Sequence, residues 1–394
     1  MVTAGTTANG LGIVRGFGRR GIRVIYLDTV RGSIARYSRY VSQRLKCRGS
    51  SESGTELTGM LLDFGKQLTR KIMIIPVGDR EVLTFSKHKK ELEQFYYLPV
   101  PDHEIVLKLV NKRKFYRLLD ELKVPHASTY FPENISELRS MGRKINFPYI
   151  IKPAYSLPFQ ESFHRKCFFI NSARELDHAS SRLKKKNFEV MIQEIIPGRD
   201  IYEFYTYFNK EAEPLAFCGW DKIRQYPPDF GSGSFCRSIS RPDAMEEGIK
   251  VLKAIGYHGL AAPELKKDPR DGRYKLIEIN ARTTLQNRLA AACGLDIEYI
   301  AYLDAAGYPI KNSLEFPDNI LWIDDFADLA SCLILLKRKK LAAGEILRCM
   351  KYRKLHSVAS WDDPVPLVAR GINICIDIIN ILIQKRNTRR TRTF

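Results

Sequence analysis

Four apolar segments typical of β-strands are each interrupted by a charged side chain. Buried strands rarely hold a charge that lacks a partner, so each of these residues needs an explanation. The interrupting residues are Lys152 in Tyr149–Lys152, Glu194 in Val190–Ile196, Glu264 in Gly259–Leu265, and Glu278 in Lys275–Asn280. The chain must therefore fold so that these charges meet solvent, each other or a ligand.

The last two segments are predicted to form a hairpin. The turn between them, residues 268–272, contains a proline followed by Asp-Gly, which suits a tight turn. Glu278 and Asn280 lie two residues apart and share a strand face, and the hairpin brings Glu264 to that face. Such a cluster of oxygens suits Mg²⁺ or Mn²⁺. The alternative is that Glu278 pairs with a lysine such as Lys275 on a solvated strand face.

Length and charge narrow the class of protein. The chain has 394 residues, which predicts two or three domains, and its 44% hydrophobic content excludes global disorder. Lys and Arg number 64 against 44 Asp and Glu, a net charge of +20 that favours anionic partners such as nucleotides, nucleic acid or acidic lipid. The eight cysteines are scattered without a Cys-x-x-Cys pair, so we expect neither a zinc site nor a disulfide framework.

The sequence predicts a cytoplasmic protein. The residues after Met1 turn polar at once, which argues against a signal peptide. The chain also lacks a run of about 18 uncharged apolar residues, so we expect no spanning helix.

Residues 1–104 alternate between strand-like and helix-like segments. A glycine-rich turn precedes a helix predicted over 11–20, and apolar strands are predicted at Val24–Leu27 and Ile72–Val77. This order is typical of a doubly wound α/β domain with a parallel sheet. The glycines do not match the spacing of the dinucleotide fingerprint, so we interpret them as allowing close helix packing.

In order along the chain, the charged motifs resemble those of the ATP-grasp superfamily. The resemblance covers about residues 1–310 and rests on Asn111-Lys112, Ile150-Ile151-Lys152-Pro153, residues 192–200, Pro263-Glu264 and residues 277–282. The stretch Trp220–Ser234 looks like the predicted carboligase branch, which resembles D-aspartate ligase. The resemblance implies an N-terminal Rossmann-like pre-ATP-grasp domain, a two-lobed α+β core and a helical basic C-terminal extension.

The implied boundaries divide the chain into three parts. The pre-ATP-grasp domain is expected at 1–104 and the ATP-grasp domain at 105–310. Within the latter, the small lobe is expected at about 120–196 and the large lobe at about 197–310. The helical extension with a polybasic tail is expected at 311–394.

The resemblance implies that ATP is held by the lysines and by the hinge between the lobes. Lys112 and Lys152 match the two lysines that contact ATP phosphates, a role that suits ammonium groups. Glu194 and Ile196 match the hinge positions whose backbone meets adenine. Asp200 falls where the superfamily usually has a glutamate that binds the ribose, and Glu203 is the alternative.

The resemblance also assigns the reacting end of the site. Glu264, Glu278 and Asn280 match the metal ligands, and Arg282 matches an arginine that steadies the transferred phosphoryl group or acyl phosphate. Lys222 and Arg224 add charge there, unless they lie on a solvated basic strand. The 231–234 loop offers either backbone amides to an anion or an ordinary turn, and the loop after Lys152 lacks the glycines common in relatives.

The implied reaction is ATP-dependent ligation of a small-molecule carboxylate to an amine. The carboxylate attacks the γ-phosphate to give ADP and an acyl phosphate, and the amine then displaces phosphate. The alternatives are a carboxylate kinase or ligase like carbamoyl-phosphate synthase, and a non-catalytic nucleotide-binding module associated with a membrane. Homodimers are common among relatives of this kind.

The C-terminal end is strongly basic. Residues 331–394 contain 14 Lys and Arg against 4 Asp and Glu, and so carry +10 of the +20. A helix is predicted over 370–384 with a broad apolar face, followed by a polybasic tail. Residues 367–394 are therefore predicted to contact an anionic membrane at its inner face. The alternative is packing on the protein or a dimer partner. Nucleic-acid binding is not expected, since the tail lacks interleaved aromatics.

Overall fold

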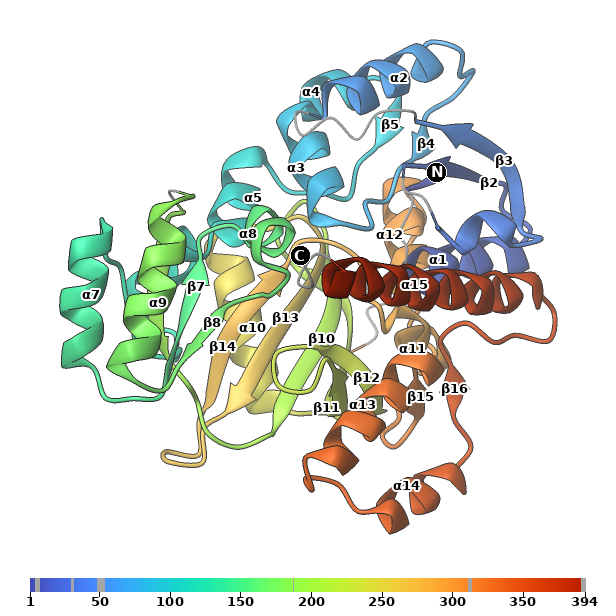
Figure 1. Cartoon of the computed structure of the whole chain (residues 1–394). Helices are drawn as coiled ribbons and strands as arrows, with labels where there is room; N and C mark the ends of the chain where they lie inside the picture. Colours follow the sequence, from blue (N-terminus) through green and yellow to red (C-terminus); the bar gives the residue numbers. More distant parts are fainter. Residues whose placement is uncertain (4–7, 30–31, 48–53, 187, 311–313, 391–394) are drawn as a thin grey trace.

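The computed structural model describes the chain except for residues 4–7, 30–31, 48–53, 187, 311–313 and 391–394. It has a mixed α/β fold (Figure 1). The N-terminal strands and helices lie at the top of the view, a small four-stranded sheet with its helices lies at the left, and a large sheet occupies the centre.

The N-terminal part is built on short parallel strands. β1 (Val2–Thr3), β2 (Val24–Asp28) and β3 (Val41–Lys46) pair in that order, and β4 (Ile72–Met73) pairs with β5 (Tyr96–Tyr97). The helices are α1 (Ala8–Arg19), α2 (Thr55–Gly65), α3 (Asp79–Lys87), α4 (Lys89–Leu92) and α5 (His103–Val110), with a 3-10 turn, η1, at Ala35–Tyr37. The helix and first strand predicted here are confirmed by α1 and β2. The strand predicted over 72–77 is shorter: β4 covers its first two residues, and Ile75 forms a separate bridge in which its N–H donates to the Met1 carbonyl.

The small sheet has the strand order β6-β9-β7-β8 and is wholly antiparallel. Its strands are β6 (Thr129–Tyr130), β7 (Tyr149–Pro153), β8 (Phe168–Ile170) and β9 (Val190–Glu194). The associated helices are α6 (Lys112–Glu121), α7 (Ile135–Lys144), α8 (Ser156–Phe163) and α9 (Ala173–Lys184). An apolar cluster that includes Leu138, Ile151 and Leu176 holds α7 and α9 on the sheet. Burial of these side chains supplies the main driving force for this packing.

The central sheet has seven strands in the order β14-β13-β10-β11-β12-β15-β16. Its strands are β10 (Ile201–Phe208), β11 (Pro214–Tyr226), β12 (Ser232–Ser238), β13 (Gly259–Lys267), β14 (Tyr274–Asn280), β15 (Leu321–Ile323) and β16 (Leu355–His356). The helices α10 (Pro242–Ala254), α11 (Asn287–Ala292) and α12 (Ile297–Ala305) cover it. Gly248 lets α10 approach closely, because an added Cβ would lie 2.7 Å from the Phe204 ring. The predicted hairpin is confirmed, since β13 pairs with β14 across residues 268–272.

The C-terminal part corrects the expectation of a mainly helical extension. It contains α13 (Asp325–Lys337), α14 (Ala343–Met350) and α15 (Val365–Arg390), but β15 and β16 join the central sheet. Trp322 in β15 pairs with Cys236 and is fully buried, so burial of an aromatic side chain places this short strand. The sheet therefore continues across the boundary expected at 310.

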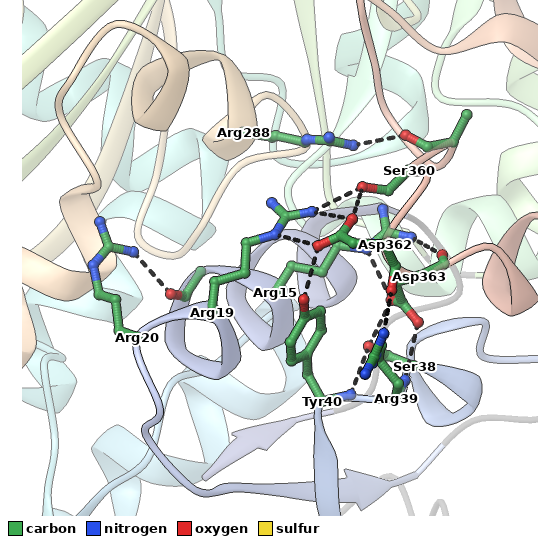
Figure 2. A network of polar contacts seen from close by, with 12 residues as sticks. Arg15, Arg19, Arg20, Ser38, Arg39, Tyr40, Arg288, Ser360, Asp362 and Asp363 are labelled. Atoms are coloured by element: carbon green, nitrogen blue, oxygen red, sulfur yellow. Dashed lines mark hydrogen bonds and ion pairs between the residues drawn. The ribbon is translucent and has the colours of Figure 1, made fainter.

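An ionic network joins the C-terminal part to the N-terminal helix α1 (Figure 2). The Arg15 guanidinium lies 2.9 Å from the Asp363 carboxylate, and both side chains are 1% exposed. Arg19 donates two hydrogen bonds of 2.8 Å to Asp362, and the Ser38 hydroxyl donates to Asp363 at 2.7 Å. We call these five residues the Asp362–Asp363 clamp. The clamp fixes the chain just before α15 begins.

Candidate active site

A cleft of about 1270 Å³ lies between the small sheet and the central sheet. Its walls come from β7, α8, the 193–199 segment, β11, β13 and β14, with further residues from α3 and α13. Ten of the eleven predicted site residues line it: Lys112, Lys152, Glu194, Ile196, Lys222, Arg224, Glu264, Glu278, Asn280 and Arg282. The structure does not bring Asp200 to this cleft; it lies exposed on the segment that precedes β10.

Three carboxylates stand side by side on adjacent strands of the central sheet. Glu203 on β10 is paired in register with Glu264 on β13, and Glu264 is paired with Glu278 on β14. Because directly opposite residues share one face of an antiparallel sheet, the three side chains form a row. We call Glu203, Glu264 and Glu278 the acidic row. The sequence considered Glu203 only as a ribose ligand, and its place beside Glu264 depends on the strand register.

Lys222 on β11 neutralises one end of the acidic row. Its ammonium lies 2.6 Å from Glu203 and 2.7 Å from Glu264. Burial raises the pKa of Glu264, whereas Lys222 lowers it and the other two carboxylates raise it again, so the net shift is upward. Burial lowers the pKa of Lys222, but the two carboxylates raise it more. The lysine therefore stays charged. It is 7% exposed, which excludes the alternative of a solvated basic strand for this residue.

Lys112 neutralises the other end of the row. Its ammonium lies 2.9 Å from Glu278, and the pKa of Glu278 is held well below its usual range by Lys112 and, further off, by Lys166 and Lys152. Lys275 instead bonds Asp268 at 2.5 Å. The alternative that Glu278 pairs with Lys275 is therefore wrong. The partner comes from the N-terminus of α6, 166 residues away along the chain.

Arg282 links the cleft to the N-terminal part. Its Nε donates to the Asp79 carboxylate at 2.6 Å, and its Nη2 donates to the Asn280 side-chain oxygen at 3.1 Å. Asp79 is the first residue of α3, where a carboxylate also interacts favourably with the helix dipole. The guanidinium is thus oriented across the open end of the cleft beside the acidic row.

The 194–196 segment connects β9 of the small sheet to the central sheet. The Glu194 carboxylate accepts from the backbone N–H of Ser128 at 2.9 Å and lies 3.0 Å from Arg270. Burial opposes ionisation here, but Arg270 and Ser128 together lower the pKa of Glu194. Lys266 donates to the Ile196 carbonyl at 2.6 Å. The side chain of Glu194 therefore holds this segment against Ser128 and Arg270, and residues 194–196 line the cleft.

Arg224 lies in the cleft wall with a partner that the sequence did not suggest. Its guanidinium lies 2.7 Å from Asp328 on α13, and the Ser234 hydroxyl donates to the same carboxylate at 3.0 Å. Arg224 is 7% exposed, so it too does not lie on a solvated strand. Ser232–Ser234 also belong to β12 and pair with β11 in part, which corrects the expectation of a free anion-binding loop.

The segment after Lys152 forms a helix where relatives are expected to have a glycine-rich loop. Residues 155–158 and Gln160 of this region line the cleft, and Lys166 follows the helix α8. Among the interactions of the described residues, the Lys152 ammonium has no carboxylate partner. An unpaired ammonium on a cleft wall is suited to bind an anionic ligand.

The donor set of the cleft fits a divalent cation that prefers oxygen. Glu264 and Glu278 are a directly opposed pair, and Asn280 lies two pairs further along the same hairpin, on the same face. Two carboxylates and an amide oxygen leave room in the coordination shell for phosphate oxygens and water, as Mg²⁺ requires. Within the described residues there is no group of three His, Cys, Asp or Glu side chains that could hold a metal alone. A metal here would therefore depend on ligands from the bound substrate.

Comparisons with known proteins show which family model and which solved structures this chain resembles. The family model for the carbamoyl-phosphate synthase L chain, ATP binding domain, matches residues 238–313, which include β13 and β14. The biotin carboxylase–beta-gamma-ATP complex from Campylobacter jejuni superposes with a TM-score of 0.63 at 16% identity, covering 79% of this chain and 71% of that one. N5-carboxyaminoimidazole synthetase from Staphylococcus aureus gives 0.62 at 14% identity, covering 80% and 79%. The chain has the ATP-grasp fold.

Proteins of similar sequence support the same ATP-grasp resemblance. D-aspartate ligase from Enterococcus faecium (strain Aus0004) is 27% identical over 243 residues, which cover 58% of this chain and 57% of the ligase. An arginine-specific carbamoyl phosphate synthase large chain from Schizosaccharomyces pombe is 22% identical over 204 residues, covering 50% of this chain and 17% of the synthase. The predicted resemblance to the ATP-grasp superfamily and to its D-aspartate ligase branch is confirmed. The matched part spans little more than half of that ligase.

Proposed function

We propose that the chain is an ATP-dependent carboxylate–amine ligase that works through an acyl phosphate and needs Mg²⁺ or Mn²⁺. One observation carries this proposal: Glu264 and Glu278 of the acidic row face a single cleft at the junction of the two lobes, together with Lys112 and the unpaired Lys152. Lysines suit the ATP phosphates, and carboxylates suit the metal that accompanies them. The matching D-aspartate ligase supports the ligase class.

The residues that line the cleft would have different roles in such a reaction. Lys112 and Lys152 would bind the phosphates, while residues 194–196 at the hinge would lie against adenine. Glu264, Glu278 and Asn280 would hold the metal, which supplies positive charge against the phosphate oxygens. Arg282 would orient the transferred group, because Asp79 holds the guanidinium toward the cleft. Lys222 and Arg224 would offset the negative charge of Glu264 and Asp328 in and behind the cleft wall.

The acyl phosphate forms when a substrate carboxylate oxygen bonds to the γ-phosphorus and the bond to ADP breaks. An amine nitrogen then bonds to the acyl carbon, phosphate leaves, and the amine loses a proton. Protein groups act chiefly by positioning and by neutralising charge in a reaction of this kind. This agrees with a cleft built from fixed ion pairs.

We also propose the domain boundaries, the cellular location and the oligomeric state of the protein. We propose that residues 1–104 are a Rossmann-like pre-ATP-grasp domain, that 105–310 form the ATP-grasp domain, and that 311–394 are a basic extension that completes the central sheet. We further propose that the protein acts in the cytoplasm on small molecules and forms a homodimer.

The test is Mg²⁺-dependent ADP release with a panel of amino acids, cell-envelope precursors and bicarbonate, in the presence of hydroxylamine. Hydroxylamine traps an acyl phosphate as a hydroxamate, so hydroxamate formed by the wild type identifies the acid. Glu278→Gln is the inactive control, and Lys186→Ala, an exposed lysine of the small lobe, is the matched neutral control.

The second candidate is a carboxylate kinase or ligase like carbamoyl-phosphate synthase. The family match to residues 238–313 favours it. ADP release that requires bicarbonate and no amino acid would support this candidate. Nucleotide binding without ADP release on any acid would instead favour a non-catalytic nucleotide-binding module.

A further inference from the structure

One side of α15 carries apolar side chains that the described part of the chain leaves exposed. They follow one another at spacings of 3, 4, 4 and 3 residues, so they form one narrow stripe along the helix. Their exposed fractions are 52% for Val365, 62% for Val368, 56% for Ile372, 49% for Ile376 and 53% for Ile379. We call these five residues the α15 stripe.

The other side of α15 is the one that packs on the protein. Ala369 is buried, and the Asn373 side chain donates to the Gly32 carbonyl at 2.7 Å. Beyond Asn373 these contacts end, and each residue from Cys375 to Asn380 whose side chain is described is exposed. The side of α15 that carries Ala369 and Asn373 therefore anchors the helix, and the opposite side offers the stripe to something outside the described chain.

Trp361 adds an aromatic anchor at the start of α15. Its side chain is fully exposed, at 103%, and it directly precedes Asp362 and Asp363. The clamp fixes these two aspartates against α1 (Figure 2). Trp361 is thus displayed by a rigid part of the molecule. Tryptophan is favoured where an apolar phase meets water.

The charge at the other end of α15 indicates which kind of partner would cover the α15 stripe. Residues 381–394 contain Lys385, Arg386, Arg389, Arg390 and Arg392, and they contain no Asp or Glu. An occupant must therefore combine an apolar interior with a negatively charged surface. A second copy of this chain offers the same apolar stripe, but its matching end is equally basic and supplies no complementary negative surface.

We propose that α15 lies on the surface of an anionic lipid bilayer, with the α15 stripe and Trp361 at the headgroup boundary and the basic end over the lipid phosphates. An amphipathic helix with basic residues binds in this manner, in the plane of the membrane. No described helix is long and apolar enough to cross a membrane. The inference uses no residue of the cleft, so it stands apart from the proposed ligase activity.

The experiment is flotation of the full chain with vesicles of phosphatidylcholine alone and of phosphatidylcholine with about 30% phosphatidylglycerol. We expect flotation with the anionic vesicles only, and weaker flotation at about 0.5 M salt, because salt screens the basic residues. Absence of flotation with anionic vesicles at low salt overturns the proposal.

Two triple variants separate the apolar and ionic parts. I372S/I376S/I379S removes most of the α15 stripe and should weaken anionic-vesicle binding by on the order of 100-fold. K385Q/R386Q/R389Q should weaken it by about 100-fold. The matched control for charge is K184Q/K185Q/K186Q on the exposed end of the small lobe, and the control for exposed apolar area is Tyr130→Ser. Both controls should float like the wild type.

Intrinsic fluorescence reports whether the helix enters the boundary. The chain has three tryptophans, of which Trp220 and Trp322 are buried. Vesicle binding should shift the emission of Trp361 to the blue and make it quenchable by brominated lipid, and Trp361→Phe should abolish both changes. Unaltered thermal unfolding and far-ultraviolet circular dichroism show that each variant is folded.

The remaining outcomes contradict the proposal. If the stripe variant floats like the wild type, or Trp361 emission stays unchanged on binding, contact is ionic only and the helix does not enter the bilayer. If the stripe variant instead changes the sedimentation mass of the protein in solution, a second copy of the chain covers the stripe.

Discussion

The acidic row and the Asp362–Asp363 clamp are both built from ion pairs, but the surroundings of these pairs differ. In the clamp, Arg15 finds a carboxylate and two backbone carbonyls, and the Asp363 carboxylate accepts from Arg15, the Ser38 hydroxyl and the Arg39 backbone N–H. In the row, Glu264 and Glu278 share their lysines with neighbours and line open space. Closed ion pairs mark an anchor between segments, whereas ion pairs that line a cleft mark a site prepared for further charge.

Lys152→Ala should give the largest effect of these variants. It should lower activity and leave stability nearly unchanged. Loss of an ammonium that binds the transferred phosphates should slow ADP release by about 10²–10⁴-fold. The free energy of unfolding should change little, because Lys152 has no carboxylate partner among the described residues. Steady-state ADP release and urea unfolding measure the two quantities, with Lys186→Ala as control. Wild-type turnover in Lys152→Ala would show that the cleft does not bind the transferred phosphates through this lysine.

Asp363→Ala should give the opposite pattern. It leaves the Arg15 guanidinium buried without its carboxylate, which should lower the free energy of unfolding by about 3–5 kcal/mol. ADP release per folded molecule should stay close to wild type. Urea unfolding followed by circular dichroism measures the loss, and Asp63→Ala, in an exposed ion pair with Lys66, is the control. A loss under about 1 kcal/mol would mean that the clamp is not an anchor.

Glu298 gives a third case to compare with the two ion-pair clusters. It is buried, and among the described residues no cation pairs with it. It accepts hydrogen bonds from Tyr205, Thr283 and Asn287, and burial raises its pKa to about 7. The folded protein therefore holds a proton that the unfolded chain releases above about pH 4.3. Stability from this residue should be full below that pH, fall as the pH rises to about 7, and stay low above it.

The Glu298 contribution should amount to about 3 kcal/mol across that pH range. Urea unfolding of the wild type and of Glu298→Gln at about pH 5 and about pH 8 measures it. The amide cannot ionise, so its unfolding free energy should depend less on pH than that of the wild type. Equal pH dependence of the two proteins would show that Glu298 ionises normally.

Arg20→Ala should give the smallest effect. Arg20 lies 2.6 Å from Asp296 and over the Tyr299 ring, but its side chain is 40% exposed. Exposed pairs of this kind contribute about 0–1 kcal/mol. The expected change in unfolding free energy is therefore below about 1 kcal/mol, and it should shrink further in high salt. A loss as large as that of Asp363→Ala would show that exposure does not separate the two pairs.

Local sequence patterns were enough to predict the strands that carry the site. β7, β13 and β14 follow from apolar runs, and the hairpin follows from its Pro and Asp-Gly turn. The shared face of Glu278, Asn280 and Glu264 follows from the alternation of side chains along a strand.

The partners of the site residues could not be predicted, because they depend on register and on distant segments. Lys222 meets Glu203 and Glu264 only through the alignment of β10, β11 and β13. Arg224 meets Asp328 over a separation of 104 residues. The strands β15 and β16 are too short, at three and two residues, to give a periodic signal.

The clamp sets an order of events during synthesis. Arg15 emerges from the ribosome 348 residues before Asp363, and at about 5–20 residues per second that interval is roughly 20–70 s. Throughout this time the nascent N-terminal helix must keep its guanidinium hydrated or held by a chaperone, and β12 must wait for β15 as its neighbour. Final docking of the first helix must therefore wait until Asp363 has been synthesised, and chains stalled before Asp363 should expose this helix to proteases.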